Sequence, residues 1–162
     1  MSNIQFLEKE ATCLRCAMEI CSKGKSPLPT PDFPVMNCKF ASLLLAYHIF
    51  HISKDVEIVY VAGFGKNLVS HVWLEIEDHV FDITGDQFNM IEDEQLYEEI
   101  LASRPYPKVH IEKCSQTYLY KLFERTERMP LERQFPAFKN SFIRKLESSY
   151  VFLKERLPLQ PQ

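Results

Sequence analysis

Residues 69–83 have the sequence Val-Ser-His-Val-Trp-Leu-Glu-Ile-Glu-Asp-His-Val-Phe-Asp-Ile, which contains the clearest structural pattern of the chain. Apolar side chains alternate with other side chains on both sides of the acidic pair Glu77-Asp78. Such alternation is typical of strands that turn one face toward a core. We therefore expect strands at about residues 69–76 and 80–83, joined as an antiparallel hairpin.

The pairing register of this hairpin predicts a pair of functional side chains. When the apolar side chains of both strands share the core face, Glu75 lies opposite Val80 and Trp73 lies opposite Asp82. His71 and Asp82 then share the other face on a diagonal, with roughly 7–8 Å between their backbones across the two strands, a separation that their side chains can bridge. An imidazole acts as a general base when a carboxylate on its second nitrogen holds its tautomer and orientation. The hairpin thus predicts His71 as a base and Asp82 as the group that orients it.

A nucleophile for this pair is predicted upstream, at Cys38. The sequence from Cys38 to Phe50 is apolar nearly all round, which indicates a buried helix that begins at the cysteine. The helix dipole and a neighbouring imidazolium both favour a thiolate at that position. Backbone N–H groups at the helix start, with the Asn37 side chain as a second donor, are candidates to bind an oxyanion.

Other residues near this set have competing interpretations. Trp73 shares the face of His71, where it either shields the His–Asp pair from water or serves only in packing. Asp86 is an alternative orienting carboxylate if the register shifts, although a turn-capping role fits the hairpin better. We expect Gln87 and Phe88 to be turn and packing residues.

Three motifs resemble those of a known enzyme superfamily. They are Phe33-Pro-Val-Met-Asn-Cys-Lys-Phe-Ala-Ser-Leu-Leu-Leu, Ser70-His-Val-Trp-Leu-Glu-Ile and Phe81-Asp-Ile-Thr-Gly-Asp-Gln-Phe. In this order they resemble the transglutaminase-like branch of the papain-like cysteine hydrolases. The resemblance implies an α+β fold, in which a central helix that begins at the nucleophilic Cys packs on a small antiparallel sheet with flanking N- and C-terminal helices. It also implies a catalytic triad of Cys38, His71 and Asp82.

The rest of the chain supplies further predicted elements. Apolar residues repeat at helical spacing at Leu7, Ala11, Leu14, Met18 and Cys21, and again at Phe138, Phe142, Leu146, Tyr150 and Leu153. Prolines and Gly24 predict an ordered loop at residues 22–35 that borders the site. We also expect strands at about residues 56–62 and 109–111, a helical segment at 90–103 and another that begins at Gln116.

Composition limits the classes of function. The chain has 162 residues, a net charge of -3 and 46% hydrophobic residues, values typical of one globular domain without a nucleic-acid-binding face. We expect residues 1–157 to form a single cysteine-hydrolase-like domain and residues 158–162 a flexible tail. No apolar run is long enough to span a membrane. The odd number of cysteines and the lack of a secretory signal favour reduced thiols in the cytoplasm.

We expect neither a metal nor another cofactor. The Cys-x-x-Cys spacing of Cys13 and Cys16, with Cys21 nearby, invites a zinc or redox interpretation, but these cysteines fall in a predicted amphipathic helix without a second ligand pair. The leading hypothesis is a thiol-dependent hydrolase that cleaves an amide bond of a protein or peptide through a thioester: a thiol protease, isopeptidase or glutamine deamidase. The alternatives are a transglutaminase or acyltransferase with the same triad, and a non-catalytic interaction module. The sequence does not predict an oligomeric state.

Overall fold

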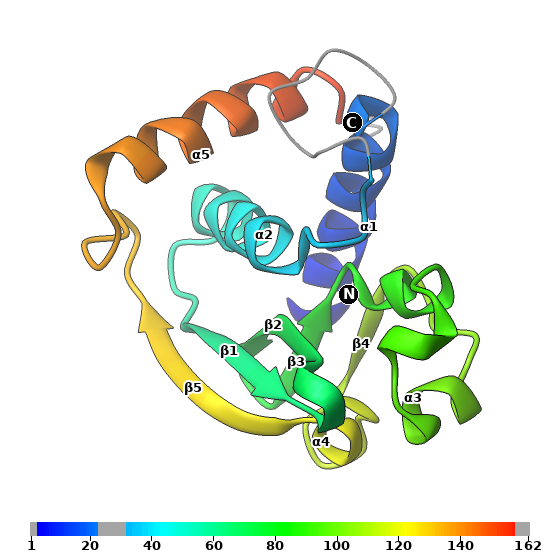
Figure 1. Cartoon of the computed structure of the whole chain (residues 1–162). Coiled ribbons are helices and arrows are strands. Elements are labelled where there is room, and N and C mark those ends of the chain that lie inside the picture. Colours follow the sequence, from blue (N-terminus) through cyan, green and yellow to red (C-terminus); the bar gives the residue numbers. More distant parts are fainter. Residues whose placement is uncertain (1–2, 23–31, 158–162) are drawn as a thin grey trace.

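A computed structural model describes residues 3–22 and 32–157 and shows an α+β protein with one antiparallel sheet. The five strands lie in the order β4-β3-β2-β1-β5 (Figure 1). Their bounds are β1 Ile58–Phe64, β2 Ser70–Ile76, β3 His79–Asp82, β4 His110–Lys113 and β5 Glu124–Leu131. The α-helices are α1 Asn3–Ser22, α2 Cys38–Ile52, α3 Glu98–Ala102, α4 Leu119–Leu122 and α5 Asn140–Lys154. Short 3-10 helices occupy Lys66–Leu68, Gly85–Asn89 and Asp93–Gln95.

The main core lies between one face of the sheet and the three long helices. Helix α2 packs on β1 and β2 and is covered by α1 and α5, so it has apolar neighbours on several sides (Figure 1). This position explains why its sequence is apolar nearly all round. The sheet contributes side chains of alternate positions, among them Val72, Leu74, Ile76 and Phe81.

A second, smaller core covers the opposite face of the sheet. Trp73 and Val80 project from the sheet into it, and Phe88, Tyr106 and Phe123 come from the segment that follows β3. Strand β2 is therefore buried on both faces. The face that carries His71 is covered by protein, and the candidate site lies where this second core meets the start of α2.

The elements nearest the site confirm the sequence predictions. Strands β2 and β3 pair antiparallel, with Glu75 opposite Val80, as the hydrophobic pattern required. The predicted N-terminal, central and C-terminal helices are α1, α2 and α5, and the strands predicted near residues 56–62 and 109–111 are β1 and β4. Leu7, Leu14, Leu146 and Leu153 are fully buried, as their helical spacing indicated.

The prediction of a helix from Gln116 onward is wrong. Only Leu119–Leu122 is helical there, and the chain then forms β5, which pairs with β1 along the sheet edge. Most β5 side chains are exposed and half of them are charged, so the strand has no apolar alternation to reveal it. The helix predicted at 90–103 is reduced to α3 and a 3-10 turn. Much of the loop predicted at 22–35 and the tail at 158–162 lie outside the described residues.

Candidate active site

Cys38 is the first residue of α2, where the preceding backbone turns sharply. Met36 adopts a left-handed conformation with φ of 61°, and the carbonyl oxygen of Asn37 accepts the N–H of Ala41 at 2.8 Å, the first bond of the helix. Helix-start N–H groups lack intrahelical partners, and Asn37 makes no side-chain capping bond to them. Cys38 is half-buried as a residue, and its thiol lies in a buried position beside His71.

His71 and Asp82 form the hydrogen bond that the hairpin register predicts. His71 Nε2 lies 2.8 Å from Asp82 Oδ2, and both side chains are 0% exposed. The other carboxylate oxygen of Asp82 accepts the backbone N–H of Thr84 at 3.0 Å. The backbone of Thr84 therefore holds the Asp82 carboxylate in place, and the carboxylate in turn orients the imidazole.

The electrostatics join Cys38 to this pair. Burial alone would raise the pKa of the Cys38 thiol, but its hydrogen bond to His71 and the charge of the imidazolium lower the pKa overall. Burial alone would lower the pKa of His71, but the charge and hydrogen bond of Asp82 together with Cys38 raise it to about 10. The Asp82 pKa is lowered, because His71 outweighs the effect of burial. These directions favour a thiolate–imidazolium pair backed by a carboxylate.

The thiol pKa shifts in the opposite direction at three of the other cysteines. Burial raises the pKa of the thiols of Cys13, Cys21 and Cys114. Cys13 and Cys21 lie on α1 with Cys16, which is exposed. In the part of the chain that the structure describes, no group of His, Cys, Asp and Glu side chains is arranged to hold a metal ion.

Gln87 contacts the imidazole directly, a role that the sequence did not predict. Its side-chain nitrogen lies 3.1 Å from His71 Nδ1, and its side-chain oxygen lies 3.4 Å from the backbone N–H of Met36. The predicted packing role of Phe88 is confirmed, since its ring packs edge-on against His71 with centroids 5.0 Å apart. In the sequence, the only sign of this role is that Gln87 is polar and follows Asp82 by five positions, on the turn after β3.

Asp86 does not orient the imidazole. Its two carboxylate oxygens accept hydrogen bonds from the Arg15 guanidinium at 2.7 and 2.6 Å, and Arg15 also donates to the carbonyl of Ile83. Both charged side chains are nearly fully buried. The pair fastens the turn at Gly85–Asn89, which carries Gln87, to helix α1.

The structure places the two secondary site predictions close to the triad residues. Asn37 directly precedes Cys38, and its side-chain nitrogen donates to the carbonyl of Val35 at 2.8 Å; its role toward an oxyanion stays a prediction. Trp73 is fully buried with its ring centroid 6.2 Å from that of His71, and its indole N–H donates to Glu75 at 3.3 Å. Packing of Trp73 is confirmed, and the shielding role stays a prediction.

The lack of a side chain at Gly85 leaves room for the side chains of Asp82 and Tyr118 to lie close to its backbone. A Cβ atom at this position would lie 2.7 Å from Asp82 Oδ2 and 2.8 Å from the Tyr118 hydroxyl oxygen. No described glycine has a positive φ, so Gly85 is required for space and not for backbone conformation. Among the described residues, the buried Tyr118 hydroxyl has no hydrogen-bond partner.

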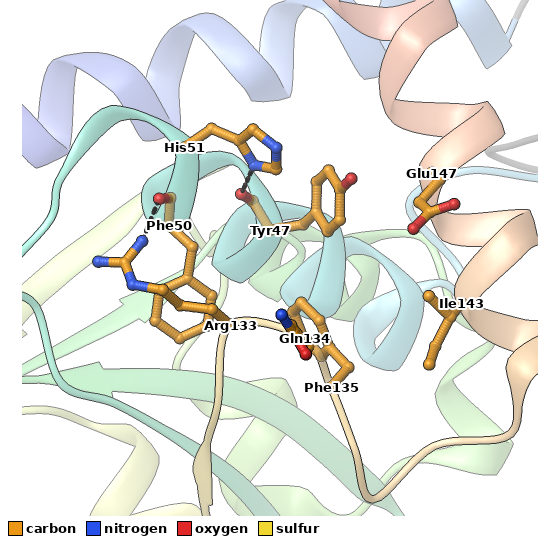
Figure 2. A pocket seen from close by; sticks show the side chains of 8 residues that line it. All are labelled: Tyr47, Phe50, His51, Arg133, Gln134, Phe135, Ile143 and Glu147. Atoms are coloured by element: carbon orange, nitrogen blue, oxygen red, sulfur yellow. Dashed lines mark hydrogen bonds between the residues drawn. The ribbon is translucent and has the colours of Figure 1, made fainter.

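A separate pocket lies at the other end of α2, away from Cys38 (Figure 2). It has a volume of about 330 Å³ and includes Arg133 and Glu147 in its lining. Arg133 donates to the carbonyl oxygens of Phe50, Ser53 and Lys54, and so it caps the C-terminus of α2. The guanidinium is thus engaged in holding the helix end.

Comparisons with family models, curated proteins and solved structures found no match to this chain. The structure by itself shows an α+β fold with a five-stranded antiparallel sheet. Within residues 3–22 and 32–157, no helix is long and apolar enough to cross a membrane.

Proposed function

We propose that this protein is a cysteine hydrolase of the papain-like, transglutaminase-like kind, with Cys38 as nucleophile, His71 as base and Asp82 as the orienting carboxylate. The observation that carries the proposal is the position of His71 between two partners. Its Nε2 is held by Asp82 at 2.8 Å, and its side chain is hydrogen-bonded to a thiol whose pKa is lowered although the thiol is buried. The α+β fold, with α2 beginning at Cys38 over an antiparallel sheet, is consistent with this superfamily.

The proposed reaction is the cleavage of an amide in a peptide or protein. The Cys38 thiolate attacks the carbonyl carbon, and the developing oxyanion accepts hydrogen bonds from backbone N–H groups at the start of α2. The His71 imidazolium gives its proton to the amine as the C–N bond breaks, which leaves an acyl group on Cys38 as a thioester. His71 then takes a proton from water, and the hydroxide releases the carboxylic acid and restores the thiol.

Transfer of the acyl group to an amine is the second candidate, because the same residues accept either nucleophile in the second step. The acceptor is chosen by the cleft and not by the triad. When a primary amine is added to the reaction, mass spectrometry of the products distinguishes the acid from the new amide.

All five cysteines are free in the structure, which agrees with the cytoplasmic location that we propose for a thiol enzyme.

The test is the rate at which iodoacetamide alkylates each cysteine at pH 7, measured by peptide mass spectrometry. Cys38 should react faster than the exposed Cys16, which is an internal reference in the same molecule. His71→Ala should remove this advantage, whereas Asp82→Asn should reduce it less, because an amide still holds the ring in place. Cys38→Ala should abolish amide cleavage in a peptide library.

Equal and slow reaction of all the cysteines would favour a non-catalytic interaction module. The triad is also wrong if His71→Ala leaves the alkylation rate of Cys38 and its pH dependence unchanged. Adding Asp82→Asn to His71→Ala should cause little further loss, since the carboxylate then has no ring to orient.

A further inference from the structure

A groove of about 420 Å³ adjoins the imidazole side of the candidate site. Its volume falls in the range of about 300–1,000 Å³ that is usual for small-molecule sites. The lining residues come from three separate segments: Met36, Asn67, Leu68, Val69, Ser70, Gln87, Phe88, Ile91, Gln95 and Leu96. None of these described lining residues carries a charge.

The groove is continuous with the reacting groups. Gln87 and Phe88, which line it, are among the residues whose side chains contact the His71 ring. Ser70 directly precedes His71 on β2, and Met36 stands two residues before Cys38. The groove thus shares its wall with residues that contact the imidazole and with the segment that leads into Cys38.

The rim of the groove is built from backbone in an unfavourable conformation. Met36, Asn67 and Leu68 have φ values of 61°, 55° and 60°, a region that is unfavourable for non-glycine residues and that clusters at ligand clamps. Asn tolerates this region, whereas Met and Leu do not favour it. Met36 and Leu68 are also 87% and 90% exposed. Two large apolar side chains are thus held out to solvent at the edge of an apolar groove.

Other cavities of similar size have a different chemistry. The pocket at the far end of α2 includes Arg133 and Glu147 (Figure 2). A third, of about 350 Å³, includes Glu57, Glu75 and Arg128. The groove beside His71 combines a neutral, largely apolar lining with contact to the candidate base.

We propose that this groove binds an uncharged, apolar acyl group of the substrate, such as the side chain of a leucine or phenylalanine next to the carbonyl that Cys38 attacks. This inference rests on the proposed function, because it takes Cys38 as the nucleophile. A charged group would lose its hydration without gaining an ionic partner in the lining, so glutamate and lysine are disfavoured. The side-chain amides of Asn67, Gln87 and Gln95 supply the hydrogen-bonding groups that orient a peptide.

The test compares chloromethyl ketones of N-acetyl-leucine, N-acetyl-glutamate and N-acetyl-lysine. In each reaction the Cys38 sulfur forms a bond to the methylene carbon as chloride leaves, so the three probes differ only in the group that enters the groove. Second-order rates are divided by the rate with iodoacetamide, which has no such group. We expect the leucine probe to react at least about tenfold faster than either charged probe.

Leu68→Lys places a cation on the rim and keeps a Cβ at the left-handed position. This variant should lower the preference for leucine over glutamate, whereas Val151→Lys, a matched change of an exposed apolar residue on α5, should leave it unaltered. Two results overturn the inference, provided that Cys38 still reacts rapidly with iodoacetamide. One is equal rates for the three probes, and the other is a preference for leucine over glutamate that Leu68→Lys does not change. If Cys38 is no more reactive than Cys16, the proposed function itself fails, and the inference fails with it.

Discussion

Substitution of Gly85 by alanine should disable the candidate site without touching Cys38 or His71. The new methyl group would lie 2.7 Å from Asp82 Oδ2, whereas carbon and oxygen atoms pack at about 3.5 Å, so roughly 0.8 Å of movement is required. The bond from Asp82 to His71 is 2.8 Å long. A shift of that size along the bond would stretch it to about 3.6 Å, beyond the usual hydrogen-bond range.

The expected loss follows from the ionisation of the thiol. When the imidazolium is no longer stabilised by Asp82, Cys38 approaches an ordinary thiol, which has a pKa of about 8.5 and is about 3% ionised at pH 7. We therefore expect the rate of alkylation of Cys38 by iodoacetamide at pH 7 to fall by about 10- to 30-fold. If the proposed amide cleavage is found, its rate should fall by about 100-fold, a loss that misplacing a catalytic group by about 1 Å can cause.

Gly65→Ala is the matched control for the loss of stability. Its Cβ would lie 2.5 Å from the Tyr97 hydroxyl oxygen, a comparable clash away from His71 and Asp82. Gly65→Ala should lower the melting temperature and leave the Cys38 rate near that of the unaltered protein. Adding Tyr118→Phe to Gly85→Ala should restore part of the rate, because it removes the second oxygen beside the new methyl group. The reasoning is refuted if folded Gly85→Ala alkylates within twofold of the unaltered protein.

Two further predictions concern pH and the buried ion pair. The folded protein holds the His71 proton more tightly than the unfolded chain, with a pKa of about 10. The contribution of this proton to the free energy of unfolding should be complete below about pH 6.5 and disappear as the pH rises through 10. The free energy of unfolding, measured by urea titration at several pH values, should therefore fall more steeply with pH in the unaltered protein than in His71→Gln, and equal pH dependence in the two proteins would contradict this. Arg15→Met leaves the Asp86 carboxylate buried without its partner and should cost about 3–5 kcal/mol in urea unfolding, most of which Asp86→Leu in the same chain should restore; an additive loss in the double variant would contradict this account.

The hairpin could be predicted from the sequence because one face of each strand enters the main core. A slip of one residue would have moved Leu74 and Phe81 out of that core, so the hydrophobic pattern determined the register and, with it, the position of Asp82 beside His71. The helix that begins at Cys38 could be predicted for a similar reason, since its burial on several sides requires a sequence that is apolar nearly all round.

Contacts between distant segments could not be predicted in this way. Gln87 and Asp86 are adjacent in sequence, yet one faces His71 and the other faces Arg15 on α1, and no local pattern distinguishes them. Strand β5 was missed because an edge strand with exposed charges has neither apolar alternation nor a turn signal. The groove beside His71 is assembled from segments that are joined only by tertiary packing.

The bond between Arg15 and Asp86 spans 71 positions of the chain and secures the turn that contacts His71. Cys38 precedes both His71 and Asp82, so a chain that is still being synthesised presents its thiol before the groups that activate it exist. During that interval the cysteine has ordinary chemistry and is in little danger of premature acylation or oxidation. Under the proposed function, heightened reactivity requires that the first and middle parts of the chain have come together, so the alkylation rate of Cys38 would then report on the completed native state.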